Sequence, residues 1–359
     1  MFKVFSDWYK RKFSNPDAAT LLALILMTML ALGFLGNMLA PVIVAIVLAY
    51  LLDWPVEKLN KLGCSRTLGT AFVLVVFIGL TVLVGLVLVP MVFKQGTNLL
   101  KEMPTIWAQS QQWIQMLPER YPGLVDGEQL HKMWQSANDK IVAVGQEIIS
   151  ASLSSLLNLA ALLIYLILVP LMVFFMLMDK HELLGNVSRL LPKERRLIKQ
   201  VGSEMNVQIT NYIRGKVIEI VIVGTASAVT FALMDLRYAL LLGVLVGFSV
   251  LIPYIGAAVV TIPVAIVGLF QWGVTPEFWY LMIAYGIIQA LDGNLLVPLL
   301  FSEAVSLHPV YIIIAVLFFG GLWGFWGVFF AIPLATLVKA VGNAWSESSS
   351  HAEESSANP

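Results

Sequence analysis

Apolar runs long enough to form membrane helices occupy most of the chain, and short stretches with charges, prolines or glycines separate them. These runs cover residues 18–35, 42–52, 67–93, 153–178, 217–234, 238–252, 257–271, 278–291 and 310–341. A helix of about 20 apolar residues spans the hydrocarbon core of a bilayer. Because several runs reach that length, the pattern predicts an all-α, polytopic membrane protein.

The first two apolar runs are predicted to form a helical hairpin. Residues 18–35 have the length of a full crossing, whereas 42–52 are marginal for one. Gly36, Asn37 and Pro41 lie between the two runs, and such residues are typical of a tight turn. The basic residues that flank the pair place both of its ends on the cytoplasmic side.

The runs 238–252 and 257–271 are joined by a stretch that contains Pro253 and Gly256. Each run is short for a crossing, so the pair forms either two short crossings or one broken hairpin. The pattern leaves both alternatives open.

The last apolar run, 310–341, is longer than one crossing needs. It contains Gly320, Gly324 and, near its end, Pro333. A hairpin or a strongly kinked helix therefore fits better than one straight rod. Glycines four residues apart also let helices approach closely. We therefore interpret Gly320 and Gly324 as packing positions in the first place and as a hinge in the second.

Residues 94–150 differ from the rest because charges of both signs return there. Apolar residues repeat at spacings of four and three in two series, which predicts two amphipathic helices separated by a break at 118–127. The first series is Leu99, Met103, Ile106, Ser110, Trp113 and Leu117, and the second is Leu130, Trp134, Ala137, Ile141, Val144 and Ile148. The apolar stripes of the two helices pack either against each other within one helical hairpin or against another subunit.

Charge placement predicts the topology. Basic residues near the amino terminus and the strongly basic connection 180–216 indicate cytoplasmic segments. Both termini are then cytoplasmic and 94–150 is extracytoplasmic. The predicted regions are 1–93 (membrane helices), 94–150 (extracytoplasmic helical insertion), 151–179 (membrane helix), 180–216 (basic cytoplasmic connector), 217–345 (carboxyl-terminal membrane transport region with broken hairpins) and 346–359 (a Ser- and Glu-rich disordered tail).

Composition supports a membrane protein and argues against other classes. Hydrophobic residues make up 59% and charged residues 12% of the 359, with a mean hydropathy of +0.85. A formal net charge of zero argues against a nucleic-acid partner. Cys64 is the only cysteine, and the four histidines are scattered without metal-ligand spacing. The sequence lacks a P-loop and a nucleophile-elbow motif, so we expect no enzyme, no cofactor and no metal site.

One polar stretch within the apolar half carries the candidate chemistry. Asp292, Gly293 and Asn294 follow an apolar helical pattern, which resumes briefly and stops at Pro298. An ionisable group among membrane-grade apolar runs is costly unless it pairs or hydrates, which favours a functional role. The stretch is either a helix interrupted at a cavity or a loop at the membrane surface.

Two further candidate residues have a simpler alternative. Glu219, in the run 217–234, is a second candidate for coupling, but Arg214 and Lys216 lie nearby and favour a position at the cytoplasmic surface. His308 precedes Pro309 and is expected to begin a helix.

Several short motifs, in order between about residues 210 and 340, resemble those of the autoinducer-2 exporter family of predicted permeases. They are Tyr212-Ile213-Arg214-Gly215, Ile252-Pro253-Tyr254-Ile255-Gly256, Asp292-Gly293-Asn294 with Pro298, Leu307-His308-Pro309 and Ala331-Ile332-Pro333-Leu334. The resemblance implies a bacterial inner-membrane protein with about seven to eight membrane segments. It also implies a secondary transporter or exporter and a homo-oligomer, such as a pentamer. Residues 94–150 are the least similar to the family.

Two classes of function follow from these observations. In the first, the chain is a permease for a small solute, such as a signalling molecule, or for an ion, coupled to protons or sodium through Asp292. In the second, it is a membrane scaffold that docks an extracytoplasmic partner through residues 94–150. A polar cavity that reaches Asp292 would favour transport, whereas a dry interior contact would favour the scaffold.

Overall fold

The computed structural model describes residues 16–120, 159–190, 196–301 and 307–342. Within these ranges the regular structure is entirely helical. Six helices there have the length and composition of membrane spans: Met38–Lys61, Arg66–Met103, Ile198–Leu233, Ile255–Trp272, Pro276–Phe301 and Pro309–Phe329. Shorter apolar helices are Tyr165–Met178, Ala239–Ser249 and Ala331–Gly342. The fold is therefore that of a multi-pass helical membrane protein.

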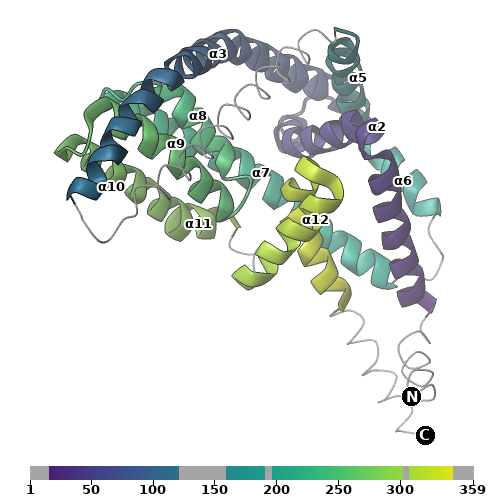
Figure 1. Cartoon of the computed structure of the whole chain (residues 1–359). Helices are drawn as coiled ribbons and strands as arrows, with labels where there is room; N and C mark the ends of the chain where they lie inside the picture. Colours follow the sequence, from purple (N-terminus) through teal and green to yellow (C-terminus); the bar gives the residue numbers. More distant parts are fainter. Residues whose placement is uncertain (1–15, 121–158, 191–195, 302–306, 343–359) are drawn as a thin grey trace, which may run out of the picture.

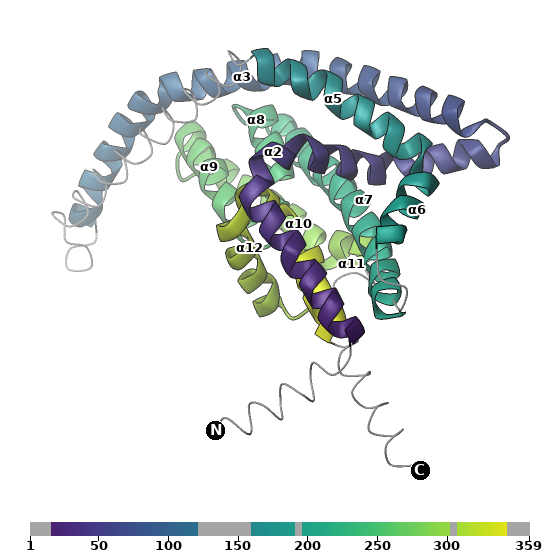
Figure 2. The ribbon, with the colours of Figure 1, turned by 90° about the vertical axis from the view of Figure 1, so that its right-hand side faces the viewer.

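The first two apolar runs lie on one continuous helix, α2 (Pro16–Lys61), and the tight turn predicted at Gly36–Pro41 is wrong. Pro41 and Pro55 both lie inside this helix. A proline removes one backbone hydrogen bond and bends a helix, but the flanking apolar residues can keep it helical on both sides. Figure 2 shows that α2 changes direction along its length, so a bend replaces the predicted turn.

Helix α3 (Arg66–Arg120) begins after a tight turn in which Gly63 adopts a φ of 96°. It is 55 residues long and arches over the rest of the molecule, with α5 (Leu159–Met178) beside its first part (Figure 2). Buried side chains from α2, α3 and α5 form one apolar core: Ala45, Leu52, Val56, Val73, Val169, Val173 and Leu177.

The first amphipathic series of 94–150 lies on the continuation of the spanning helix, because α3 passes residue 93 without a break. Helix α3 continues through Pro118 to Arg120, where the described residues end, so most of the predicted break at 118–127 lies outside them. The second series, from Leu130 to Ile148, lies outside the described residues, as does the tail 346–359.

Helix α6 (Lys180–Leu190) precedes α7 (Arg196–Leu233), one helix of 38 residues that contains the end of the basic connector 180–216 and most of the apolar run 217–234. The narrow apolar edge of its first part is buried. Val201 and Met205 pack against Ala340 of the last helix. A helix that runs through both segments brings the basic connector directly to the membrane region.

Helices α8 (Ala239–Ser249) and α9 (Ile255–Trp272) form a hairpin that packs on α7. At 1.5 Å per residue the 11 residues of α8 rise about 17 Å, which is too short to cross a bilayer. The broken hairpin is therefore the alternative that the structure adopts. Gly224 of α7 faces Gly247 of α8, and a Cβ on Gly247 would lie 2.9 Å from the Gly224 Cα.

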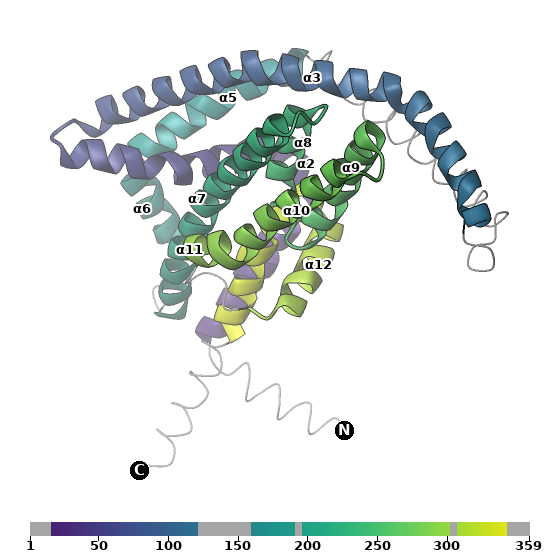
Figure 3. The same cartoon turned by 90° about the vertical axis from the view of Figure 1, so that its left-hand side faces the viewer.

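The carboxyl-terminal part of the chain runs through α10 (Pro276–Leu291), a π-helical turn η1 (Asp292–Leu296), α11 (Val297–Phe301) and α12 (Pro309–Phe329). Figure 3 shows α7, α9, α10 and α11 together below the arch of α3. His308 caps α12, because its Nδ1 accepts a hydrogen bond from the Val310 backbone N–H at 3.3 Å.

The kink expected in the last apolar run is present within α12. Gly324 has φ 58° and ψ −132°, a conformation that interrupts the helix and favours glycine. Beyond it the chain folds back, so that a Cβ on Gly327 would overlap the carbonyl oxygen of Phe319. Pro333 lies in the first turn of the helix Ala331–Gly342. Backbone N–H groups in a first turn have no acceptor within the helix, so a proline there costs no helical hydrogen bond.

Candidate functional site

The stretch around Asp292 remains helical but changes its pitch. The backbone N–H of Val297 bonds to the carbonyl of Asp292, five residues earlier, which is the π-helical pattern. A π turn inserts an extra residue into a helix and frequently marks a functional position. The α-helix is interrupted as expected, but by one widened turn rather than by a break in the helical chain, and the alternative of a surface loop is wrong.

Two residues predicted to make the break act differently in the structure. Gly293 has no positive φ, so its conformational freedom is not used. Pro298 is the second residue of α11, and the helix continues to Phe301. What the stretch provides is a widened turn that exposes Gly293 and buries Asp292.

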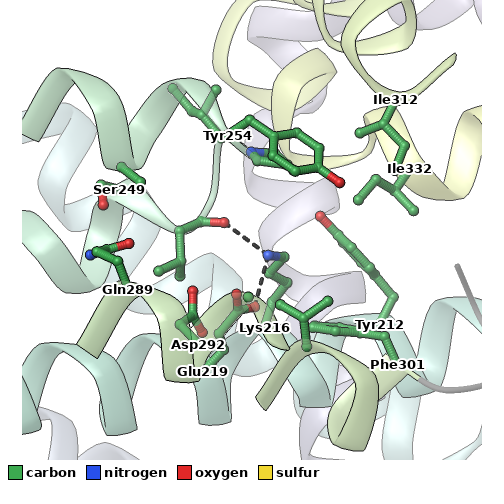
Figure 4. A pocket seen from close by; sticks show the side chains of 16 residues that line it. Tyr212, Lys216, Glu219, Ser249, Tyr254, Gln289, Asp292, Phe301, Ile312 and Ile332 are labelled. Atoms are coloured by element: carbon green, nitrogen blue, oxygen red, sulfur yellow. Dashed lines mark hydrogen bonds and ion pairs between the residues drawn. The ribbon is translucent and has the colours of Figure 1, made fainter. Parts of the chain in front are cut away.

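A cavity of about 330 Å³ lies beside this π turn (Figure 4). Its walls come from α7, the α8–α9 connection, α10, η1, α11, α12 and the final helix. The lining side chains and backbone belong to Tyr212, Lys216, Glu219, Ser249, Val250, Ile252, Pro253, Tyr254, Ala257, Gln289, Asp292, Gly293, Val297, Phe301, Ile312 and Ile332.

Lys216 is the buried cation of the cavity and joins three elements. Its Nζ lies 2.7 Å from Glu219 Oε2, one turn along α7, and donates a hydrogen bond of 2.8 Å to the carbonyl of Val250. It also lies 5.2 Å from the centre of the Phe301 ring. The side chains of Lys216 and Glu219 are 5% and 2% exposed. The ammonium therefore ties α7 to the end of α8 and to α11.

Asp292 is the second carboxyl group of the cavity. It is 8% exposed, and its Oδ1 atom has no hydrogen-bond partner within the described part of the chain. Lys216 and Glu219 both interact with it electrostatically. Gln289, one turn before Asp292, also has a buried Nε2 without an acceptor among the described residues. Among the described residues, the cavity thus holds one cation for two carboxyl groups. Asp292 Oδ1 and Gln289 Nε2 have no hydrogen-bond partner there.

Close packing by glycines and aromatic rings shapes the cavity. Gly215 of α7 leaves space for the Phe301 ring, since a Cβ there would lie 2.5 Å from Phe301 Cε1. Tyr212 donates a hydrogen bond of 2.8 Å to the carbonyl of Phe329, which fixes the bent α12 against α7. At the tip of the α8–α9 hairpin, Gly256 lies so close to Ser249 that a Cβ would overlap its carbonyl oxygen.

Tyr254 lies at the rim of the cavity, and its side chain is 57% exposed. Its φ of 63° is a left-handed conformation that a tyrosine rarely adopts. Figure 4 shows its ring over the side of the cavity that faces Ile312 and Ile332.

The structure brings together some of the residues predicted from the sequence. Asp292 and Glu219 lie in one cavity, with Pro253 and Gly293 in its wall. The surface position expected for Glu219 is wrong, because the residue is 2% exposed. Asn294 is exposed and its Nδ2 donates to the Ala290 carbonyl at 2.8 Å, so it does not line the cavity.

The other predicted residues lie outside the cavity wall. Arg214 is partly buried, and Gly215 faces Phe301 behind the lining. The remaining positions shape helix ends and bends rather than the cavity: Gly256, His308, Pro309, Gly320, Gly324 and Pro333. Among the described residues, no cluster of three or more His, Cys, Asp or Glu could hold a metal ion.

The sequence analysis does not predict Lys216, Gln289 or Phe301 as site residues, although all three line the cavity. Lys216 was considered only as a basic neighbour of Glu219, although their i,i+3 spacing on an apolar helix predicts a shared face. Gln289 precedes Asp292 by the same spacing. Phe301 carries no sequence signal for a role in the cavity, since its position depends on how α11 packs on Gly215.

The fold and the cavity define a multi-pass helical membrane protein of the transporter class, with buried charges at a solute-sized cavity. Residues 22–347 match the model of the family described as AI-2E family transporter, and the chain belongs to that family. The resemblance found in the short motifs is thereby confirmed.

Bacterial relatives align over most of the chain. "Putative permease PerM" of Escherichia coli (strain K12) is 52% identical over 345 residues, which cover 96% of this chain and 98% of that protein. "Putative transport protein YueF" of Bacillus subtilis (strain 168) is 27% identical over 318 residues, covering 86% and 84%. The family description and the names of both relatives are those of transport proteins.

Proposed function

We propose that the protein is a secondary transporter of the bacterial inner membrane that moves a small solute or an ion in exchange for protons or sodium. One observation carries the proposal: a cavity of about 330 Å³ contains two buried carboxyl groups and, among the described residues that line it, one cation. The cytoplasmic position of both termini and assembly into a homo-oligomer belong to the same proposal and remain predictions.

The charge count explains why this cavity suits coupled transport. Lys216 neutralises Glu219, which leaves Asp292 without a counter-charge of its own. A buried, unpaired carboxylate is unfavourable by several kcal/mol. Asp292 is therefore stable in the cavity when it holds a proton or faces a bound cation. Alternation between these two states couples the movement of one to the movement of the other.

The elements around the cavity offer the parts that a gate needs. The π turn at Asp292 and the tip of the α8–α9 hairpin line the same space, and Lys216 bonds to the hairpin through Val250. A change of charge at Asp292 acts on Lys216 and, through it, on the hairpin. This arrangement supports transport over the scaffold alternative, in which Asp292 would be a dry packing residue.

Flux through reconstituted vesicles tests the proposal. Purified protein is placed in liposomes that enclose a pH-sensitive dye, and inorganic cations and small cationic, neutral and anionic solutes are added outside. We expect at least one of them to drive proton efflux in the wild type and none to do so in Asp292→Asn. Glu277→Gln, the same chemical change at a fully exposed position of α10, is the control.

Coupling to protons is wrong if no solute or ion moves protons through the wild type, and the whole proposal is wrong if a sodium-sensitive dye inside the liposomes also shows no solute-driven sodium movement. It is also wrong in its mechanism if Asp292→Asn retains the wild-type rate with the same pH dependence. Equal loss in Glu277→Gln and Asp292→Asn would contradict a specific role of Asp292.

A further inference from the structure

The cavity's unused polar atoms lie on one wall. Asp292 Oδ1 is a buried acceptor without a donor, and Gln289 Nε2 is a buried donor without an acceptor, among the described residues. The two residues are one helical turn apart and both face the cavity (Figure 4). A ligand that satisfies both must therefore carry a donor next to an acceptor.

The buried cation of the cavity is already engaged. An ammonium has three donor hydrogens. Lys216 directs its Nζ to Glu219 and to the Val250 carbonyl and lies over the Phe301 ring. An anion would have to take Lys216 from these partners, and no second basic residue lines the cavity among the described residues. The site thus disfavours anions and accepts one positive charge.

The remaining walls are apolar and large. Val250, Ile252, Val297, Ile312 and Ile332 all line the cavity. The volume of about 330 Å³ lies within the range of about 300–1,000 Å³ that is typical of small-molecule pockets. A bare monovalent ion fills only a small part of such a space and leaves the apolar wall without a partner.

We infer that this cavity binds a small organic monocation: a primary ammonium on Asp292, a hydrogen-bond acceptor on Gln289 and an apolar body against Ile312 and Ile332. The inference rests on the proposed function, since it names the class of cargo for the same site. Figure 4 shows the polar residues Gln289 and Asp292 on one side and the two isoleucines on the other.

Exchange of this ligand for a proton keeps the site neutral. Without ligand, Lys216 and Glu219 cancel and Asp292 is a neutral carboxylic acid. When the ammonium enters, Asp292 releases its proton to solvent and forms an ion pair with the ligand, so the net charge is again zero. The same carboxyl group cannot hold both, and one ligand is exchanged for one proton.

The titratable groups that line the cavity come from three parts of the fold. Tyr212, Lys216 and Glu219 lie on α7, Tyr254 lies in the α8–α9 connection, and Asp292 begins η1. Tyr212 is held by the Phe329 carbonyl and Glu219 by Lys216. Asp292 is thus the group among them that is free to exchange its proton for a cation.

Binding by the purified full-length protein tests this inference. The probes are leucinol, which has an ammonium, a hydroxyl and an isobutyl group, and 4-methyl-1,2-pentanediol, in which a hydroxyl replaces the ammonium. Isoamylamine lacks the hydroxymethyl group of leucinol. Leucine carries a carboxylate in place of that group. Sodium chloride supplies an inorganic cation. Calorimetry gives the affinity, and a pH indicator in weak buffer gives the protons released.

We expect leucinol to bind at least tenfold more tightly than the diol and leucine, with release of up to one proton per site. Isoamylamine should bind less tightly than leucinol because it has no hydroxyl to accept a hydrogen bond from Gln289. Asp292→Asn should abolish both binding and proton release, and Asp292→Glu should retain part of each. Glu277→Gln, on the exposed face of α10, should behave as the wild type.

Equal binding of leucinol and the diol overturns the inference, as does a response to sodium alone. If Asp292→Asn does not fold, the comparison of probes on the wild type still decides. Sodium-driven proton flux without leucinol binding would leave the proposed function intact and refute the organic cargo. Leucinol binding that depends on Asp292, without flux, would support this inference and refute transport.

Discussion

Lys216 and Glu219 place two charges on one face of α7 where almost no water reaches them. Bringing two ions out of water is costly, and their attraction repays the cost only while both are present. The pair also holds the end of α8, since Lys216 donates to the Val250 carbonyl. The two side chains therefore act as one unit, and removing either leaves the other as an isolated buried charge.

We predict that Lys216→Met lowers the stability of the protein by about 3–5 kcal/mol, because Glu219 is left buried and unpaired. The double variant Lys216→Met with Glu219→Leu removes both charges and should regain most of the loss. Thermal unfolding of the detergent-purified protein measures both. A single variant that unfolds at the wild-type temperature would contradict the pairing, as would a double variant that is less stable than the single one.

At the scale of helices and turns, two glycines that were both predicted to break a helix have opposite roles. Gly256, at the tip of the α8–α9 hairpin, lies against the Ser249 carbonyl, so no side chain fits there. Gly293, in the π turn, has helical φ and nothing within 4 Å of the position of a Cβ. The first permits a close approach of two chain segments, whereas the second contributes an open surface.

The contrast gives a paired prediction. Gly256→Ala should cost about 1–3 kcal/mol, because the methyl group forces the hairpin tip apart. Gly293→Ala should be neutral or stabilise by up to about 1 kcal/mol, since alanine favours a helix more than glycine does. Unfolding temperatures of the two variants under one condition decide the matter. A fall for Gly293→Ala as large as that for Gly256→Ala would contradict the assignment.

The limits of the sequence interpretation follow from how a helix distributes its side chains. Asp292 could be found because a carboxyl group among apolar runs stands out in any arrangement. Asn294 was grouped with it because the stretch was interpreted as a break. On a helix, residues two apart face different sides, while residues three apart share one. Gln289 is therefore the partner of Asp292, and Asn294 bonds to its own helix.

Proline positions show the same limit at the scale of whole helices. The residues around Pro41 predict a turn, yet α2 continues through it. The local residues do not decide between a turn and a bend, because packing on the other helices determines whether the helix resumes. By contrast, Gly324 marks a true interruption, and its positive φ agrees with the expected kink of the last apolar run.

The whole molecule is held together by contacts between the arch and the carboxyl-terminal helices. Gln95 of α3 accepts a hydrogen bond from the Leu241 N–H at 2.9 Å, and Glu102 pairs with Arg237 at 3.2 Å. At the other end, Lys180 joins Asp53 at 2.8 Å. The first two contacts join α3 to the start of α8 and to the turn before it, and the third joins α6 to α2.

The length of α3 leads to a prediction for the whole molecule. Its 55 residues correspond to about 80 Å, whereas the hydrocarbon core is about 30 Å thick, so a large part of it must lie outside the bilayer. The apolar part comes first and the charged part, from Lys94, comes last. The turn before α3 carries the native Cys64, which is exposed and flanked by Lys61 and Arg66.

Basic residues favour the cytoplasmic side, so Cys64 should be cytoplasmic and the end of α3 extracytoplasmic. A membrane-impermeant maleimide should label Cys64 in inverted vesicles and fail to do so in intact spheroplasts. Cys64→Ser is the blank for background labelling. In that variant, Arg120→Cys should be labelled in intact spheroplasts. Labelling of Cys64 from outside, or of residue 120 only from the cytoplasmic side, would reverse the topology and contradict an extracytoplasmic position for 94–150.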